Sequence, residues 1–322
     1  MGEYVGGSGP KVSEYRFDGH VAVITGAGRG IGRAYALLLA SRGASVVVND
    51  LGGSVSGAGS DPGPAEAVAA EINAKGGSAF ADSSDVATGG GACAVVDSAV
   101  ERFGRLDVVI NNAGIIRWAG FPEADEDNLS RHLEVHTVSS FNVARAGWTH
   151  MVGQGYGRIL NTTSSGLFGL SNNISYATAK AAVIGLTRSL AVAGAKHDIR
   201  VNLIAPAAVT RMAGSTGEGD DPAMAPERVA PMAAYLVHED CPVTGEMYAA
   251  GGGRFARMFV ASVPGYVHSG TDVTVEDVAA HWEQINDESG YTVPADLESW
   301  SAAFLTHLMQ RANPDAGHDP VS

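Results

Sequence analysis

Short apolar runs rich in Val and Ile recur over the first 250 residues and alternate with longer segments of helical spacing. The runs span His20–Thr25, Ser45–Asp50, Ser78–Asp82, Leu106–Asn111, Gly157–Thr162, Ile199–Ala205 and Gly245–Ala250. Strands separated by helices pair in parallel through right-handed crossovers, so the pattern predicts a seven-stranded parallel sheet. Most runs lack polar alternation, which is typical of strands covered on both faces. We therefore expect an α/β, doubly wound fold.

Two segments fall outside this rhythm. The stretch Leu51–Pro64 is rich in Gly, Ser and Pro, which predicts a long surface loop. Beyond Gly253, two helical patterns at Thr274–Asn286 and Pro294–Gln310 predict a helical appendage, residues 254–322. Thr274, followed three residues later by an acid, is a typical helix start. We expect a main domain over residues 15–253 with the appendage packed on it.

Charge and composition exclude several classes of protein. The chain has 322 residues, is 45% hydrophobic and carries a formal net charge of −14, which indicates a globular protein and argues against sequence-independent binding to nucleic acid or anionic membranes. It lacks a membrane-spanning apolar stretch and a signal peptide, so we expect a cytoplasmic location. The two cysteines are too few for a disulfide framework or a four-cysteine zinc site, and we expect no metal.

A glycine-rich turn, Thr25–Gly32, lies between a predicted strand and a predicted helix. Such a turn lets the backbone approach a pyrophosphate, and the helix N-terminus supplies amide donors. Asp50 ends the next strand, where a carboxylate binds the ribose hydroxyls of NAD and repels the 2′-phosphate of NADP. Arg29 argues the other way, because it can pair with that phosphate. We expect NAD, since Asp50 would lie directly at the ribose.

Tyr176 and Lys180 are four residues apart in a helical pattern and therefore share a helix face. An ammonium beside a phenol lowers the pKa of the tyrosine and favours the phenolate, which is a general base. On its own such a pair is usually only a solvated helix face. The hydroxyl cluster Thr162–Ser165 at the end of a preceding strand adds weight, because ligands bind at this edge of open α/β sheets.

In this order, the glycine turn, Asn111–Gly114, the hydroxyl cluster and the Tyr/Lys pair resemble the short-chain dehydrogenase/reductase family over about residues 15–253. The resemblance implies a Rossmann-type enzyme, commonly a dimer or tetramer. It implies that Tyr176 is the acid/base, that Lys180 lowers the tyrosine pKa and holds the nicotinamide ribose, and that a serine positions the substrate oxygen. Counting back from the tyrosine selects Thr163 for that serine, whereas alignment from the strand selects Ser164. We expect Ser164, because strand register fixes side-chain direction, with Thr163 and Ser165 as alternatives.

The resemblance also implies the cofactor contacts. The pyrophosphate turn and ribose acid correspond to Gly26, Arg29, Gly30, Ile31, Gly32 and Asp50. The adenine, ribose and carboxamide contacts correspond to Asp85, Val86, Asn112, Ala113, Gly114, Pro206 and Val209, together with Tyr176 and Lys180. His136 stands where the family commonly has an Asn. Its main-chain carbonyl can still serve a proton relay, or the histidine is simply packed; both interpretations stay open.

Residues 46–53, 135–148 and 274–282 further resemble the (3R)-hydroxyacyl-CoA dehydrogenase part of peroxisomal multifunctional enzyme type 2 and its bacterial relatives. This implies oxidation of a 3-hydroxyacyl-CoA that carries a fatty acyl or steroid side chain. The alternatives are a 17β-hydroxysteroid or other free-alcohol dehydrogenase, and a catalytically silent NAD-binding sensor or assembly partner. The phosphates of CoA would need basic partners, and the hypothetical candidates are Arg117, Arg211, Arg254 and Arg257. The alternative interpretation, that these are ordinary surface arginines, stays open.

Overall fold

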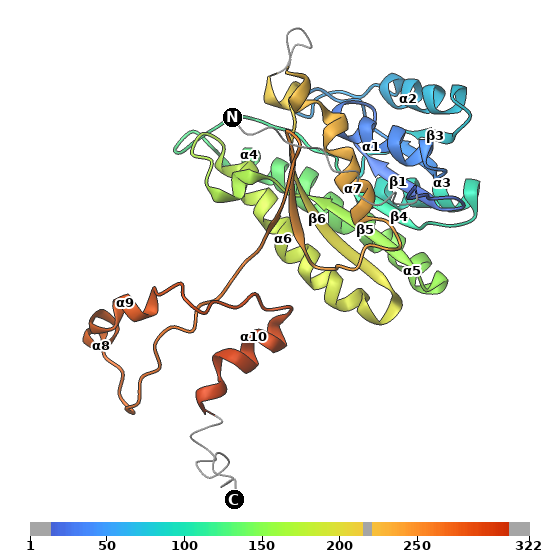
Figure 1. The fold of residues 1–322 in the computed structure, drawn as a ribbon. Coiled ribbons are helices and arrows are strands. Elements are labelled where there is room, and N and C mark those ends of the chain that lie inside the picture. Colours follow the sequence, from blue (N-terminus) through green and yellow to red (C-terminus); the bar gives the residue numbers. More distant parts are fainter. Residues whose placement is uncertain (1–13, 215–220, 309–322) are drawn as a thin grey trace, which may run out of the picture. The chain divides into compact units, whose positions relative to one another are not determined.

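An eight-stranded sheet forms the centre of the chain in the computed structural model, which describes residues 14–214 and 221–308 (Figure 1). The strand order is β3-β2-β1-β4-β5-β6-β7-β8, and the first seven strands are parallel. The strands are β1 Val21–Thr25, β2 Ser45–Asn49, β3 Ser78–Asp82, β4 Val108–Asn111, β5 Gly157–Thr162, β6 Ile199–Ala207, β7 Met247–Gly251 and β8 Arg254–Met258. The order reverses direction between β1 and β4, which is the point where open α/β sheets bind ligands.

The predicted count of seven strands is one short, because β8 extends the edge of the sheet. Gly252 and Gly253 connect it to β7, and both have positive φ, +57° and +78°. A two-residue connection of this kind is a type I′ hairpin, so β8 runs antiparallel to β7. Its residues are exposed or only partly buried. An edge strand of this kind lacks the continuous apolar run that identified the other seven.

Helices cover both faces of the sheet, as the apolar runs predicted (Figure 1). One face packs against α1 Gly30–Ser41, α2 Gly63–Ala74 and α7 Ala230–Leu236. The other packs against α3 Gly89–Phe103, α5 Ser139–Gln154 and α6 Ile174–Gly194. Successive residues of β1 alternate between the two cores: Ala22 and Ile24 enter the first, and Val21 and Val23 the second. The doubly wound α/β fold is therefore confirmed.

Shorter helical segments shape the carboxyl edge of the sheet. A π-helical turn, Glu134–Val138, joins α4, Glu126–Leu133, to α5. Such turns are rare and are found frequently at functional sites. Short 3₁₀ segments at Ser165–Phe168, Arg211–Ala213, Pro222–Met224 and Pro226–Arg228 follow β5 and β6 along the chain, whereas the one at Ala195–His197 precedes β6 at the opposite edge.

The chain divides into two compact units, Met1–Arg257 and Met258–Ser322. The boundary falls between Arg257 and Met258, the last two residues of β8, whereas the sequence predicted it after Gly253. The second unit contains α8 Val275–Ala280, α9 Trp282–Ile285 and α10 Leu297–Phe304, so both predicted helical patterns form helices. Thr274 and Asp277 form the predicted cap. The end of the second pattern and of the predicted appendage lies outside the described residues, and its packing on the main domain stays a prediction.

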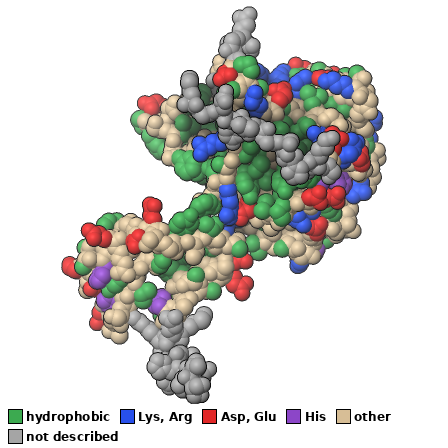
Figure 2. All heavy atoms as spheres, viewed as in Figure 1, with side chains coloured by type: hydrophobic (Ala, Val, Ile, Leu, Met, Phe, Trp, Pro, Cys, Tyr) green, Lys and Arg blue, Asp and Glu red, His purple; other side chains and the backbone are tan. Residues whose placement is uncertain are grey.

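Membrane-spanning helices, metal-binding groups and surface charge also bear on function. None of the helices in the described ranges combines the length and the apolar character needed to cross a membrane. Within the same ranges, no group of three or more His, Cys, Asp or Glu side chains is placed to hold a metal ion. Acidic and basic side chains are interspersed over the face of the first unit seen in Figure 2.

Candidate active site and cofactor pocket

A cavity of about 290 Å³ opens at the carboxyl ends of the strands around the switch point. It brings together most of the predicted cofactor residues: Gly26, Arg29, Gly30, Ile31, Gly32, Asp50, Asp85, Val86, Asn112, Ala113 and Gly114. Pro206 and Val209 do not line it, although Thr210, Arg211 and Met212 directly after them do. Tyr176 and Lys180 are likewise outside its lining.

The glycine turn is packed so closely that side chains would not fit. A Cβ on Gly26 would lie 2.8 Å from Ala113 Cα, and one on Gly32 would lie 2.2 Å from Gly26 O. The amide of Asn112 donates to Thr25 O and Gly26 O at 3.0 and 3.1 Å, which ties the turn to the end of β4. No described side chain caps the N-terminus of α1, and its first turn carries no acid. These free amides and the helix dipole fit a diphosphate.

Two backbone amides hold the Asp50 carboxylate at the wall of the cavity. Its Oδ2 accepts from Gly28 N at 2.9 Å and its Oδ1 from Gly52 N at 2.7 Å. Burial lowers the pKa of Arg211, and the nearby charge of Arg29 lowers it further, while Asp50 opposes both. One acid and two arginines therefore share this end of the cavity.

Of the three candidate hydroxyls, the structure places Ser164 beside Tyr176. A Cβ on Gly166 would lie 3.5 Å from Ser164 Oγ and 3.7 Å from Tyr176 Cε1, so the two side chains are neighbours, and Ser164 Oγ also accepts from Gly166 N at 3.1 Å. Thr163 is buried, and its hydroxyl donates to Lys180 O at 2.8 Å. Ser165 is exposed. Ser164 is thus the candidate nearest to Tyr176, and its catalytic role stays a prediction.

Tyr176 lies in the first turn of α6, where the side chain of Asn173 accepts from its N–H at 3.2 Å. Burial raises the pKa of Tyr176, and the neighbouring Ser164 hydroxyl opposes this rise. Lys180 Nζ donates to Thr162 O at 2.8 Å and lies 5.8 Å from the centre of the Tyr176 ring. Burial lowers the pKa of Lys180 to about 7.

These pKa directions differ from the sequence expectation. In the polypeptide by itself the pKa of Tyr176 is raised, not lowered, and Ser164 rather than Lys180 acts to lower it. The reason is burial: removing both groups from water disfavours the phenolate and the ammonium alike.

His136 is packed as a neutral group between Gly114 and Tyr176. Its Nε2 lies 2.9 Å from Ile115 O, and its ring meets the Tyr176 ring edge-on at 5.3 Å. A Cβ on Gly114 would lie 2.6 Å from the imidazole. Burial, followed by the charge of Lys180, holds the pKa of His136 well below its usual value. Its main-chain carbonyl accepts from Ser140 Oγ at 2.7 Å.

One wall of the cavity was not predicted from the sequence. The loop between β2 and α2, predicted as a surface loop, supplies Leu51, Gly53, Ser54, Val55 and Gly57 to the lining. Arg131 of α4 and Val135 of the π-helical turn complete this side. The Gly/Ser/Pro-rich composition of this loop did not indicate a binding role, but its length did. Connections in α/β units usually have two to six residues, and structureless loops above about 12 are commonly functional.

The four arginines considered for CoA phosphates have different surroundings. Arg117 pairs with Asp127 at 3.0 Å, and Arg257 pairs with Glu246 at 2.7 Å. Arg211 lies in the cofactor cavity and Arg254 is exposed on β8. Two of the four are thus already held by acids of the protein.

The family model for short chain dehydrogenases matches residues 20–221. The chain therefore belongs to the short-chain dehydrogenase family, and it is an NAD(P)-dependent oxidoreductase that acts on CH–OH donors through a dinucleotide-binding Rossmann domain.

Individual relatives are similar to this chain over most of its length. The chain is 41% identical over 300 residues to peroxisomal multifunctional enzyme type 2 of Mus musculus, covering 92% of this chain and 40% of the mouse protein. It is 43% identical over 275 residues to a putative short-chain type dehydrogenase/reductase of Mycobacterium tuberculosis, covering 84% of this chain and 95% of that protein. The solved full-length peroxisomal multifunctional enzyme type 2 of Drosophila melanogaster superposes with a TM-score of 0.76 at 32% identity, over 92% of this chain and 50% of that one. The chain thus spans about two fifths of the mouse relative.

Proposed function

We propose that the protein oxidises the 3-hydroxyl group of a 3-hydroxyacyl-CoA to a ketone with NAD⁺, the acyl part being a fatty chain or a steroid side chain. The observation that carries the proposal is the placement of the Ser164 hydroxyl beside the Tyr176 ring, with Lys180 one turn along α6. The likeness to multifunctional enzyme type 2 over 92% of the chain supports the substrate class.

The residues of this chain divide the work in the following way. The bound dinucleotide supplies the hydride acceptor. Ser164 Oγ holds the substrate hydroxyl, and the phenolate oxygen of Tyr176 takes its proton as the ketone forms. Lys180 holds the nicotinamide ribose and, as an ammonium, favours the phenolate. In the direction of reduction, Tyr176 returns the proton to the carbonyl oxygen.

The remaining cofactor residues follow the cavity. The amides at the start of α1 hold the diphosphate, and Asp85 and Val86 flank the adenine. Asp50 accepts the ribose hydroxyls, which is why we propose NAD rather than NADP. Pro206 and Val209 meet the carboxamide. The three residues after Val209 line the cavity, which supports this placement.

Initial rates of NAD⁺ reduction test the substrate class. The assay compares (3R)-hydroxyacyl-CoA esters of short, medium and steroid type with free 17β-hydroxysteroids, with NADP⁺ as the control cofactor. A clear preference for the CoA esters supports the proposal. Turnover of free alcohols alone would replace it by the 17β-hydroxysteroid alternative while keeping the three catalytic residues. Binding of NADH without any turnover would favour the silent sensor.

The proposal includes assembly and location. We propose a homo-oligomer, dimer or tetramer, as is common in the family, and light scattering on the purified protein measures its mass. A cytoplasmic location also remains a proposal, because the mouse and Drosophila relatives are named peroxisomal. Cell fractionation against a peroxisomal marker decides between the two compartments.

A further inference from the structure

The tip of the loop between β2 and α2 is docked on the segment that follows β4. Ile116 N donates to Val55 O at 3.0 Å. Gly57 lies against Ile115, whose Cγ2 would be 2.9 Å from a Cβ added to that glycine. The loop is also closed on itself, since Asp61 N donates to Leu51 O at 2.9 Å. It is therefore an ordered wall of the cofactor cavity.

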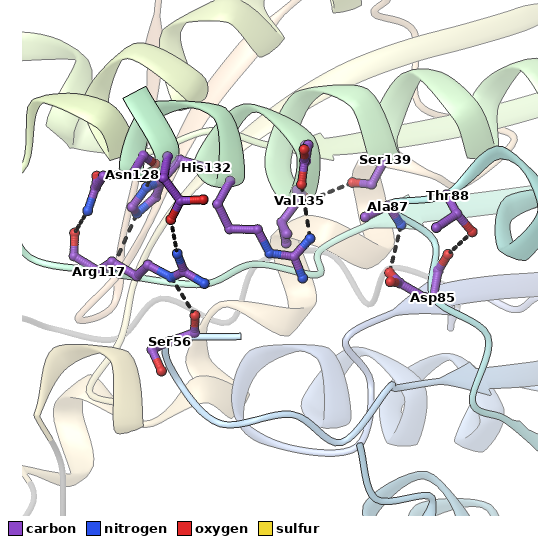
Figure 3. A network of polar contacts seen from close by, with 12 residues as sticks. Ser56, Asp85, Ala87, Thr88, Arg117, Asn128, His132, Val135 and Ser139 are labelled. Atoms are coloured by element: carbon purple, nitrogen blue, oxygen red, sulfur yellow. Dashed lines mark hydrogen bonds and ion pairs between the residues drawn. The ribbon is translucent and has the colours of Figure 1, made fainter. Parts of the chain in front are cut away.

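Arg117 holds this tip from outside the cavity. Its Nε donates to Ser56 O at 2.9 Å, and its guanidinium pairs with Asp127 at 3.0 Å (Figure 3). Arg117 itself does not line the cavity, so any effect on the cofactor must act through the loop. Because the acceptor on Ser56 is the main-chain carbonyl, the contact does not depend on the Ser56 side chain.

The backbone of Arg117 is fixed by α4. Its N–H donates to His132 Nε2 at 3.2 Å, and its carbonyl accepts from Asn128 Nδ2 at 3.2 Å (Figure 3). His132 Nδ1 lies 2.7 Å from Asn128 O, so Nδ1 carries the proton and Nε2 is free to accept. The same ring meets Tyr176 edge-on at 6.2 Å. The buried His132 therefore contacts both Arg117, which holds the loop, and Tyr176, the proposed acid/base.

We propose that Arg117 is a positioning residue for the dinucleotide. It keeps Ser54–Gly57 against the adenosine end of the cavity, near Asp50 and Asp85, so that release of the cofactor requires the Arg117–Ser56 contact to break. In this proposal Arg117 touches neither the substrate nor the reacting atoms. Its role is to hold the loop, not to bind the phosphates of CoA. The inference rests on the proposed function only in that a nicotinamide dinucleotide is the ligand.

Stopped-flow release of NADH tests this inference without any substrate. Equilibrium binding, followed by NADH fluorescence, is measured on the same proteins. We expect Arg117→Ala to release NADH about tenfold faster, with a matching rise in Kd, because a hydrogen bond from a charged donor is lost. Asp127→Ala should show a smaller change in the same direction. Arg16→Ala, which also removes an arginine paired with an exposed acid, Asp18, but lies outside the cavity lining, is the matched control and should release NADH at the wild-type rate.

Each possible result either supports or overturns the inference. Wild-type release rates in Arg117→Ala would overturn the inference while leaving the proposed function intact. If Arg117→Ala does not fold, Asp127→Ala decides, because its side chain is 83% exposed and its removal leaves the core untouched. Faster release from that variant supports the inference and an unchanged rate overturns it. A wild-type protein that binds no NADH would overturn the proposed function and this inference together.

Discussion

Ser164, at the end of the loop after β5, and Tyr176, in the first turn of α6, lie side by side at Gly166, where an added Cβ would be 3.5 Å from Ser164 Oγ and 3.7 Å from Tyr176 Cε1. The Ser164 hydroxyl counteracts the effect of burial on the pKa of Tyr176, because a donor beside the phenolate oxygen favours the charged form. One hydroxyl therefore has two effects: it tunes the base and it lies beside the place where the substrate oxygen would bind.

Removing that hydroxyl should affect both rate and pH dependence. We expect Ser164→Ala to lower kcat for alcohol oxidation by on the order of 10²-fold, comparable to loss of one positioned donor elsewhere. The apparent pKa of the rising limb of the oxidation profile should also move upward, since the hydroxyl that lowers the pKa of Tyr176 is gone. Steady-state kinetics across pH measure both, and Ser165→Ala, an exposed neighbour, is the control. A loss of kcat in Ser165→Ala instead would move the assignment.

The raised pKa of Tyr176 predicts opposite pH trends for the two directions. Oxidation needs the phenolate, whose fraction grows as pH rises toward and beyond the usual tyrosine value of 10. Reduction needs the phenol and should slow over the same range. Profiles of kcat/KM from pH 6 to 10 for both directions measure this. An oxidation rate that falls steadily with pH would contradict Tyr176 as the base.

Burial of Lys180 predicts a stability trend in the protein without cofactor. Its pKa falls to about 7 on folding from its usual 10.5, so between these values the unfolded chain binds more protons. The cost of burying the charged form is therefore complete below pH 7 and diminishes as pH rises. Lys180→Met lacks this cost.

We accordingly expect Lys180→Met to gain in free energy of unfolding relative to wild type at pH 6.5, and this advantage to shrink by pH 9.5. Urea unfolding of both proteins across that range gives the difference directly. A difference that stays constant with pH would show that Lys180 titrates alike in the folded and unfolded chains.

Asp50 should decide the cofactor. Asp50→Asn keeps one acceptor oxygen, for the amide of either Gly28 or Gly52, and removes the negative charge, leaving Arg29 and Arg211 to meet a 2′-phosphate. We expect the ratio of kcat/KM for NADP⁺ to that for NAD⁺ to rise about tenfold or more. Asp61→Asn, on the same loop but outside the cavity lining, is the control. A wild-type preference for NADP⁺ would contradict the assignment at the outset.

The sequence was sufficient for the features that local pattern determines. Seven strands and the glycine turn follow from apolar runs and glycine spacing, and the strand register at Gly157–Thr162 led to Ser164. The edge strand β8 could not be predicted, because partly exposed strands have no continuous apolar run. The contact between Ser56 and Arg117 could not be predicted, because the two residues lie 61 positions apart and local patterns do not pair distant residues. The pKa of Tyr176 depends on how deeply tertiary packing buries it, which no spacing reveals.

The most direct test of the account compares wild type with Tyr176→Phe in two assays. One is the initial rate of NAD⁺ reduction with a (3R)-hydroxyacyl-CoA, and the other is the Kd for NADH. Phenylalanine keeps the ring that packs against His136 and removes only the hydroxyl. We predict a rate below about 10⁻³ of wild type, since the general base is lost, with the Kd nearly unchanged. A variant that retains a substantial fraction of the wild-type rate would contradict the mechanism.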